Sequence, residues 1–244
     1  MAKGEIPTVK IWEDDEFLHN EFGVNYRFGK LGLNASAYNT DWQDRNLTKS
    51  VTTGQGDSGD TDVIFLTGVN QKHSGVELET NYMVNDMLDL MFVASFGNWK
   101  FDGDANGNYQ ETEYNSEGQA VGYKTTEYAY ALDGLYVGDM PQTSYVLGVT
   151  LKPIKDLRIQ AIHKMYDKNY SDWSPSAREF DGTNDDADRS QVWEAPSYSR
   201  LDLHMSYKLP KVKDLDMTLT ANIFNALDEV YVQDAVDNSQ YNGF

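Results

Sequence analysis

The 244-residue sequence contains no cysteine and few basic residues. The absence of cysteine excludes disulfide bonds, thiolate nucleophiles and zinc or iron–sulfur centres with cysteine ligands. Only 20 lysines and arginines stand against 39 aspartates and glutamates, so the formal net charge is −19. A general nucleic-acid-binding protein carries a basic patch or stripe, and this composition therefore excludes that class.

Long hydrophobic runs and enzyme signatures are missing as well. A membrane-spanning helix needs about 20 apolar residues, and the runs here are only a few residues long. Strands of an outer-membrane barrel are only half apolar, so that class stays open. Residues 1–5 are polar and contain no signal peptide, which predicts either a cytosolic protein or a chain that lacks its true start. No G-x-S-x-G, P-loop or Rossmann motif occurs, the four histidines lack ligand spacing, and we expect no enzyme.

The sequence does show apolar and polar residues that alternate with a period of two. Phe22, Val24, Tyr26 and Phe28, for example, are separated by polar or small residues. The pattern predicts an all-β fold, an antiparallel meander of about eight strands, with no long amphipathic helix. The predicted strands cover residues 21–28, 31–38, 75–82, 88–97, 145–151, 157–164, 201–207 and 217–223.

The connections between these strands differ strongly in length. Short turns are expected near Gly29, Asn85, Ile154 and Val212. Long polar connections are expected over 41–62 (part of which extends the strands), 100–142 and 171–196. Structureless loops beyond about 12–15 residues are uncommon in compact domains. Short turns at one end and long loops at the other are typical of outer-membrane barrels.

The five tryptophans fit the same interpretation. Each lies at the long-loop end of its nearest strand; they are Trp12, Trp42, Trp99, Trp173 and Trp193. Trp42 and Trp99 lie roughly 28 Å from the start of their strands, measured along the axis of a barrel with tilted strands. This distance is close to the thickness of the hydrocarbon core, so they are expected near a water–lipid interface. Their parity is that of the polar face, so with regular pairing they point into the lumen of a barrel.

Four segments, in this order, resemble motifs of the TonB-dependent outer-membrane receptors, in a Bacteroidetes-like form. SGVELE at 74–79 is similar to the family's GxELE strand, and NIFNALDEVY at 222–231 to its near-C-terminal N-φ-F-N-x-x-D-x-x-Y segment. MPQ at 140–142 and YDKNYSDW at 166–173 also look like that family. The similarity extends from about residue 15 to the end of the chain.

This resemblance implies a receptor in the outer membrane of a Gram-negative bacterium, which imports a scarce nutrient such as a siderophore, cobalamin or a glycan. Family members have a 22-stranded barrel plugged by an N-terminal domain. The implied partners are outer-membrane lipid, the plug domain of the same full-length chain, TonB through the plug, and a small-molecule or glycan ligand, with no nucleic acid. No plug, TonB box or returning last strand is visible in residues 1–244. We therefore expect a partial barrel domain, part of a larger transmembrane β-barrel, that lacks the plug, N-terminal strands and the last strand and is not functional alone.

Two sets of residues are candidates for contact with a ligand. The polar strand face is expected to line the lumen and meet the plug; it comprises Glu21, Asn25, Arg27, Asn34, Glu77, Glu79, Asn81, Asp89, Arg158, Gln160, Lys164, Asp202 and His204. Aromatic residues of the long loops are expected to stack on the ligand; these are Trp99, Tyr109, Tyr128, Tyr130, Trp173 and Trp193.

One loop matches a calcium-binding pattern. Asp102, Asp104 and Asn106, followed by Gly107 and Glu113, fit D-x-D-x-N-G-x₅-E. Alternating carboxylate and amide oxygens surround a hard cation in such loops. The flanks here are strand and loop rather than helices, so an acidic, solvated surface loop is the alternative interpretation.

Two other architectures remain open at this point. The chain could form a complete small outer-membrane barrel of eight strands with a structural or adhesive role. It could also form a soluble, calcium-dependent β-sandwich that binds glycans. A sandwich buries one face of each sheet, whereas a barrel carries one continuous apolar band.

Overall fold

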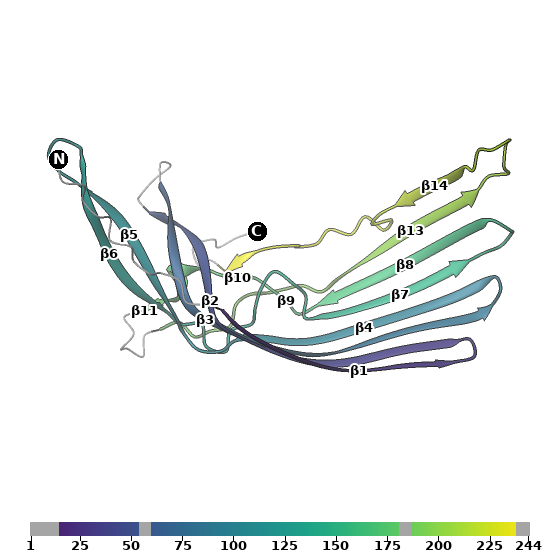
Figure 1. Ribbon diagram of the computed structural model, residues 1–244, viewed down its shortest axis with the longest axis horizontal. Helices are drawn as coiled ribbons and strands as arrows, with labels where there is room; N and C mark the ends of the chain where they lie inside the picture. The colour runs from purple at the N-terminus through teal and green to yellow at the C-terminus, as the bar shows by residue number, and fades with distance from the viewer. Residues whose placement is uncertain (1–14, 54–59, 181–186, 238–244) are drawn as a thin grey trace.

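Eight strands of an eleven-stranded antiparallel sheet follow one another in the order that the sequence predicts. The computed structural model describes residues 15–53, 60–180 and 187–237. The strands are, in spatial order, β1 (Glu16–Phe28), β2 (Leu31–Thr53), β3 (Asp60–Asn85), β4 (Leu88–Phe101), β7 (Thr143–Leu151), β8 (Leu157–Asp167), β13 (Tyr198–Lys208) and β14 (Thr218–Ile223). Their hairpin turns gather at one end of the molecule, on the right in Figure 1. All eight predicted strands and all four short turns are thus confirmed.

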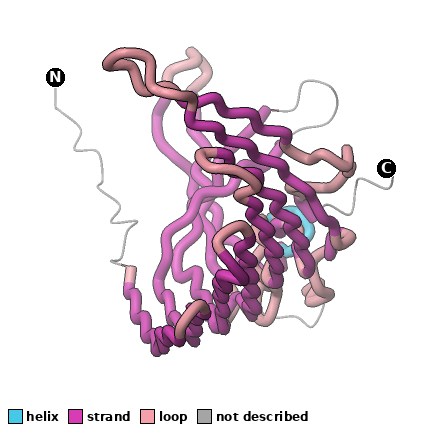
Figure 2. The backbone as a smooth tube through the Cα atoms, turned by 90° about the vertical axis from the view of Figure 1, so that its right-hand side faces the viewer, coloured by secondary structure: helices cyan, strands magenta, loops and turns pink. Residues whose placement is uncertain are grey.

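The sheet is curved but open. Figure 2, viewed from the turn end, shows the strands following an open curve. Among the described residues, β1 pairs only with β2 and β14 only with β13, so these two edges do not meet. A closed eight-stranded barrel and a two-sheet sandwich are therefore not what the described residues form.

The pairing register gives the sheet one apolar and one polar face. Directly opposed residues form an apolar row across five strands: Val24, Ala35, Leu78, Ala94 and Tyr145. The neighbouring row on the other face is small or polar: Gly23, Ser36, Glu77, Ser95 and Ser144. Because side chains alternate across a strand, every strand presents the same two faces, as the alternation predicts.

The apolar face is not covered by any described part of the chain. Phe22 and Phe28 are 74% and 71% exposed. Two cavities, of about 530 and 280 Å³, form against the polar face, which indicates that the sheet curves around that face. A broad, continuous apolar surface of this kind marks contact with lipid or protein rather than with water.

The three long connections are present at the other end, and they contain more regular structure than was expected. Residues 41–62 largely continue β2 and β3, and 100–142 contain the hairpin of β5 (Ala105–Tyr114) and β6 (Ala120–Tyr130). The segment 171–196 contains only short elements: β10 (Asp172–Trp173), α1 (Pro175–Arg178), β11 (Glu179–Phe180) and β12 (Glu194–Ala195), next to β9 (Asn169–Tyr170). Strands with water on both faces carry polar residues at both parities, and the period-two signal is then lost.

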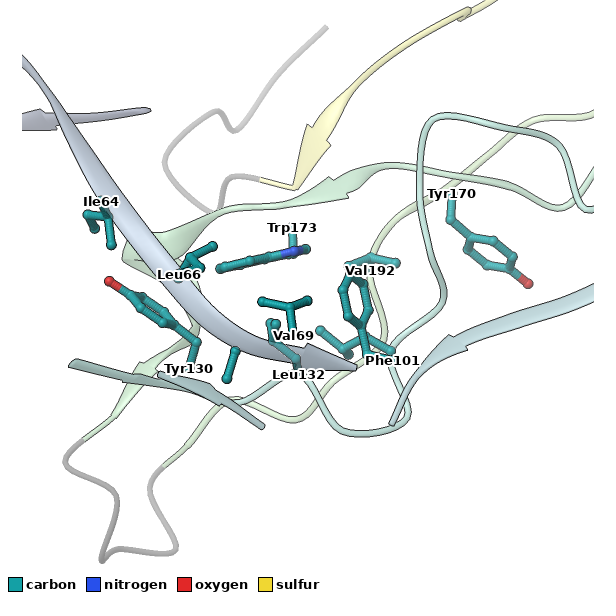
Figure 3. Close-up of a cluster of buried hydrophobic side chains, with 11 residues drawn as sticks. Ile64, Leu66, Val69, Phe101, Tyr130, Leu132, Tyr170, Trp173 and Val192 are labelled. Atoms are coloured by element: carbon teal, nitrogen blue, oxygen red, sulfur yellow. The ribbon is translucent and has the colours of Figure 1, made fainter. Parts of the chain in front are cut away.

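The outer hairpins pack into a small core of their own, which we call the outer subdomain. β3 pairs with β4 near the turns and with β5 farther out, at Phe65, Leu66 and Thr67. The core lies where these strands meet the segment around β10 (Figure 3), and its buried side chains are Ile64, Leu66, Val69, Phe101, Ala105, Tyr130, Leu132, Leu135, Tyr170, Trp173 and Val192. The outer ends are therefore packed structure, not a set of separate loops.

A buried arginine ties the last described strand to this subdomain. Arg178 at the end of α1 is 1% exposed and donates to the carbonyl oxygens of Asp188 and Ser190, at 2.9 and 2.7 Å. Its guanidinium also pairs with Asp237 in β15 (Val236–Asp237) at 2.6 Å. Strand β15 in turn pairs in parallel with β10. A single cation thus joins the end of α1, the segment 188–190 and β15, which lies 59 positions farther along the chain.

Candidate functional site

Aromatic and imidazole rings gather on the polar face near its outer end. Trp99 donates its indole N–H to the hydroxyl of Tyr38 at 2.8 Å. His73 stacks on Trp99 with ring centroids 5.6 Å apart, and His19 stacks on Tyr38 at 6.3 Å. We call these four residues, contributed by β1 to β4, the aromatic platform.

Two opposed glycines allow these rings to lie flat on the sheet. Gly75 of β3 faces Gly97 of β4 in the ladder. A Cβ atom at Gly75 would come within 2.5 Å of the Tyr38 hydroxyl, and one at Gly97 within 2.8 Å of the Trp99 ring. One face of each ring therefore covers glycine backbone, and both side chains remain partly exposed on the polar face of the sheet. Flat, partly exposed rings of this kind are suited to stacking on a ligand.

A buried glutamine holds Trp99 in place. Gln142 is 2% exposed; its side-chain oxygen accepts the Trp99 backbone N–H at 2.9 Å, and its amide donates to the Trp99 carbonyl at 3.0 Å. Gln142 is the last residue of the MPQ segment that the sequence singled out. The Gln142 side chain thus makes the two backbone hydrogen bonds that a neighbouring strand would make at Trp99. A glutamine is suited to this position because its amide both donates and accepts.

Further ring and cation contacts extend from the aromatic platform to the edge strand β1. Phe17 packs edge-on against Trp42 at 5.6 Å, and the Arg45 guanidinium lies 3.6 Å from the centre of the Trp42 ring. Arg45 also donates to Gln71, and His73 lies 3.1 Å from the same Gln71 oxygen. Trp42 and Trp99 therefore belong to the polar face, as their parity predicts, and not to a lipid-facing girdle.

A second aromatic cluster lies across the sheet, over β8 and β13. Tyr198 stacks between Tyr166 and Tyr231, with centroids 4.9 and 4.3 Å away. Arg200 donates to the Tyr231 hydroxyl at 2.9 Å. Asn225, with φ of 49°, forms a tight turn after β14, and the chain then continues toward the outer end past this cluster.

The spacing of residues in the 222–231 segment thus has a local structural basis. The backbone N–H of Asn225 donates to the buried carboxylate of Asp202, which also pairs with Lys164 at 2.9 Å. The Asn225 side chain bonds the backbone of Glu229 twice, at 3.0 and 3.1 Å. These contacts return the chain to the polar face, where Tyr231 completes the tyrosine stack.

The structure places the predicted stacking residues in different environments. Trp99 lies in the platform, Trp193 is 38% exposed and Tyr128 is partly buried. The side chain of Tyr109 lies outside the described residues. Two predictions need correction: Tyr130 and Trp173 are 0% and 2% exposed, packed against each other in the outer core, and offer no free ring face. The sequence analysis did not identify Tyr38, His19 and His73 as stacking residues. The only signal for them was the pair of glycines, Gly75 and Gly97, whose pairing is known only from the structure.

The structure does not bring the four predicted calcium ligands together. Asp102 pairs with Lys72 at 2.7 Å, and Asp104 pairs with both terminal nitrogens of Arg189, at 2.9 and 2.8 Å. Asn106 and Glu113 lie seven residues apart in the extended strand β5, roughly 23 Å at ~3.3 Å per residue. Within the described ranges, no group of three or more acidic or histidine side chains is arranged to hold a metal ion.

The outer end of the molecule is strongly acidic. Its described segments, 38–53, 60–74, 98–142, 167–180, 187–200 and 224–237, carry 21 acidic and nine basic residues, a net charge of −12. Arg189 beside Asp104 holds the pKa of that carboxyl below its usual range. Partial burial, together with the carboxylates of Asp172 and Asp234, raises the pKa of Asp139 to about 6. Such a surface disfavours polyanionic ligands and favours neutral or cationic ones.

Comparison with known proteins gives a family match and a fold match. Residues 19–226 match the family model described as TonB dependent receptor-like, beta-barrel. The copper transporter OprC is similar in structure, with a TM-score of 0.56 and 15% identity over 93% of this chain and 28% of OprC. The CymD monoaromatic hydrocarbon channel gives a TM-score of 0.47 and 13% identity over 86% of this chain and 59% of CymD.

The chain thus spans well under two thirds of either solved structure. A search of curated proteins found no match. Within the described residues, no helix is long and apolar enough to cross a membrane.

Proposed function

The chain belongs to the TonB-dependent receptor-like β-barrel family, and from this membership we propose that it forms part of the wall of an outer-membrane receptor that imports a scarce nutrient. The continuous apolar face supports this placement, because residues such as Phe22 and Phe28 are exposed to whatever surrounds the sheet. The polar face would line the lumen, where the plug domain and, through it, TonB would act. The family match is the observation that carries the proposal.

We also propose that the sheet is completed by further strands of a longer polypeptide. Among the described residues, the outer edges of β1 and β14 have no partner strand, which leaves backbone N–H and C=O groups unpaired. In lipid each unsatisfied group costs several kcal/mol, so spanning sheets close into barrels. Strands that pair with both edges would remove this cost and convert the open curve into a closed wall.

For the ligand we propose a neutral or cationic molecule that stacks on the aromatic platform. Of the three nutrient classes considered, a neutral glycan fits best, because sugar rings present flat apolar faces to aromatic side chains and polar edges to amides. The Trp99 and Tyr38 rings, which lie flat over glycine, provide the stacking surface, and His73 in the same platform is held by the buried Gln71. Polyanionic ferric siderophores fit least, since the outer end carries a net charge of −12.

An uptake experiment tests this proposal. Cells that carry the complete gene would be compared with Trp99→Ala and with Phe96→Ala, which lies on the same strand but on the lipid-facing side. Growth would be followed on oligosaccharides as the sole carbon source, on ferric siderophores as the sole iron source, and on cobalamin. We expect Trp99→Ala to reduce uptake of one oligosaccharide at least about 10-fold, as loss of a central aromatic contact does.

The control defines the outcome. Phe96→Ala should leave uptake unchanged at equal protein level in the outer-membrane fraction. Equal uptake by Trp99→Ala and the parent on every nutrient would contradict a role for the platform. Absence of the protein from the outer-membrane fraction would contradict the receptor assignment itself.

A further inference from the structure

The turn end of the sheet differs in charge from the rest of the molecule. Its four connecting segments, 27–32, 83–89, 152–158 and 208–217, carry eight basic and five acidic residues, a net charge of +3. The outer end carries −12, as described above. A chain with a net charge of −19 therefore concentrates unbalanced positive charge at one end of its strands.

A cleft between two neighbouring turns combines this charge with apolar side chains. The cleft has a volume of about 640 Å³ and lies between the turn at Asp86–Met87 and the turn around Ile154. Its lining includes the apolar Met87, Ile154 and Leu157 and the basic Lys155, Arg158 and Lys208. Asp86 and Asp156 also line it.

Most of the cations at this cleft have no carboxylate partner. Lys152, at the same cleft, is neutralised by Asp89 at 2.5 Å. In the part of the chain that the structure describes, no carboxylate lies within ion-pair distance of Lys155, Arg158 or Lys208. These three cations are therefore available to an anion from outside the chain.

The tips of the turns are apolar, which sets them apart from ordinary solvated turns. Ile154 is 59% exposed and Met87 is 53% exposed. Both lie in turns just beyond the end of the apolar face, which includes the 46% exposed Leu151. Apolar tips flanked by lysines are typical of segments at the boundary between acyl chains and headgroups, where long basic side chains extend to the phosphates.

We propose that this cleft binds the headgroup of an anionic phospholipid in the leaflet that surrounds the turn end. Lys155 and Lys208 would contact the phosphate, and Ile154 and Met87 would lie among the first methylenes of the acyl chains. The inference rests on the proposed membrane placement of the apolar face. An acidic protein segment inside the lumen explains the cations but not the exposed apolar tips, so the lipid is favoured.

Native mass spectrometry of the detergent-solubilised chain tests the proposal. The protein would be mixed with equal amounts of phosphatidylglycerol and phosphatidylcholine, and the lipids that stay bound would be counted. We expect phosphatidylglycerol to be retained preferentially. The double variant Lys155→Gln/Lys208→Gln should reduce this preference about 30-fold, the effect of two basic residues at an anionic surface. The matched variant Lys124→Gln/Lys168→Gln, at the outer end, should leave it unchanged.

Three results would overturn the inference. Equal retention of both lipids by the parent chain would show that the cleft does not distinguish lipids by the charge of their headgroups. Displacement by millimolar inorganic phosphate, with no effect of acyl chains, would assign the cations to free phosphate. Displacement by polyglutamate would assign them to an acidic partner. A chain that binds both lipids equally, yet fractionates with the outer membrane, would remove this inference while leaving the proposed function intact.

Discussion

Adding one methyl group at Gly75 should destabilise the sheet by disturbing the aromatic platform. A Cβ atom there would lie 2.5 Å from the Tyr38 hydroxyl and 2.7 Å from the backbone oxygen of Phe96. The tyrosine ring can move, but the backbone oxygen cannot move without distorting the ladder. Overpacking costs about 1–3 kcal/mol, and loss of the bond from Trp99 to Tyr38 adds about 1 kcal/mol. Gly75→Ala should therefore lower the free energy of unfolding by about 2–4 kcal/mol.

Urea unfolding of the chain in detergent micelles, followed by tryptophan fluorescence, measures this change. The matched control is Gly23→Ala on β1, where the nearest atoms to an added Cβ are 3.7 Å away, an ordinary contact. That variant should stay within about 0.5–1 kcal/mol of the parent, in the stabilising direction, since alanine suits a strand better than glycine. If both variants unfold at the same urea concentration, the Tyr38 and Trp99 rings are not packed flat over the glycines, and the platform geometry is refuted.

Three further changes test other parts of the structure. Arg178→Met should lower stability by about 3–5 kcal/mol, because it leaves Asp237 and two carbonyl oxygens unpaired, and limited proteolysis should then cleave near residue 237 faster than in the parent. The pKa of Asp139 is raised to about 6, so the folded state is favoured in full below about pH 4 and loses this contribution as the pH rises through 6. Asp139→Asn should abolish this loss of stability. Melting temperatures of parent and variant that run parallel from pH 4 to 7.5 would contradict the prediction. Trp173→Ala should cost about 3–5 kcal/mol in thermal unfolding because it empties the outer core, whereas Trp193→Ala, at a 38% exposed position, should cost far less; equal losses would place Trp173 outside the core.

The part of the sheet near the turns was predictable from the sequence because one of its faces is apolar there. Alternation of the kind seen at Phe22, Val24 and Tyr26 fixes both the strand and the face that each residue occupies. Short turns with glycine or asparagine, as at Gly29, then fix the register of each hairpin. The lumen-facing orientation of Trp99 followed from the same parity.

The outer subdomain was not predictable in this way. Tyr130 and Trp173 are 43 positions apart in the sequence, and nothing local shows that they pack together. The acidic loop at Asp104 matched a calcium pattern, but Arg189, 85 positions away, neutralises it instead. Non-local pairing of this kind depends on how the hairpins meet, which a single sequence does not record.

Only Trp99 of the aromatic platform was predicted from the sequence as a stacking residue. Glycines have no side-chain pattern, so the opposed pair of Gly75 and Gly97 becomes meaningful only when the ladder places them side by side. His73 appears in the sequence as an isolated histidine without ligand spacing. Its role as a ring stacked on Trp99 emerges from the register of two strands.

The length of β3 has a mechanical consequence. This single strand of 26 residues is bonded to β4 at one end and to β5 at the other. A force applied to the outer hairpins along the strand loads many interstrand hydrogen bonds in shear at once, rather than separating them one after another. The register of β2 against β3 is interrupted only around Arg45, so bending is concentrated there. Displacement of the outer subdomain is thereby converted into a tilt about this point, which lies beside the rings of the platform.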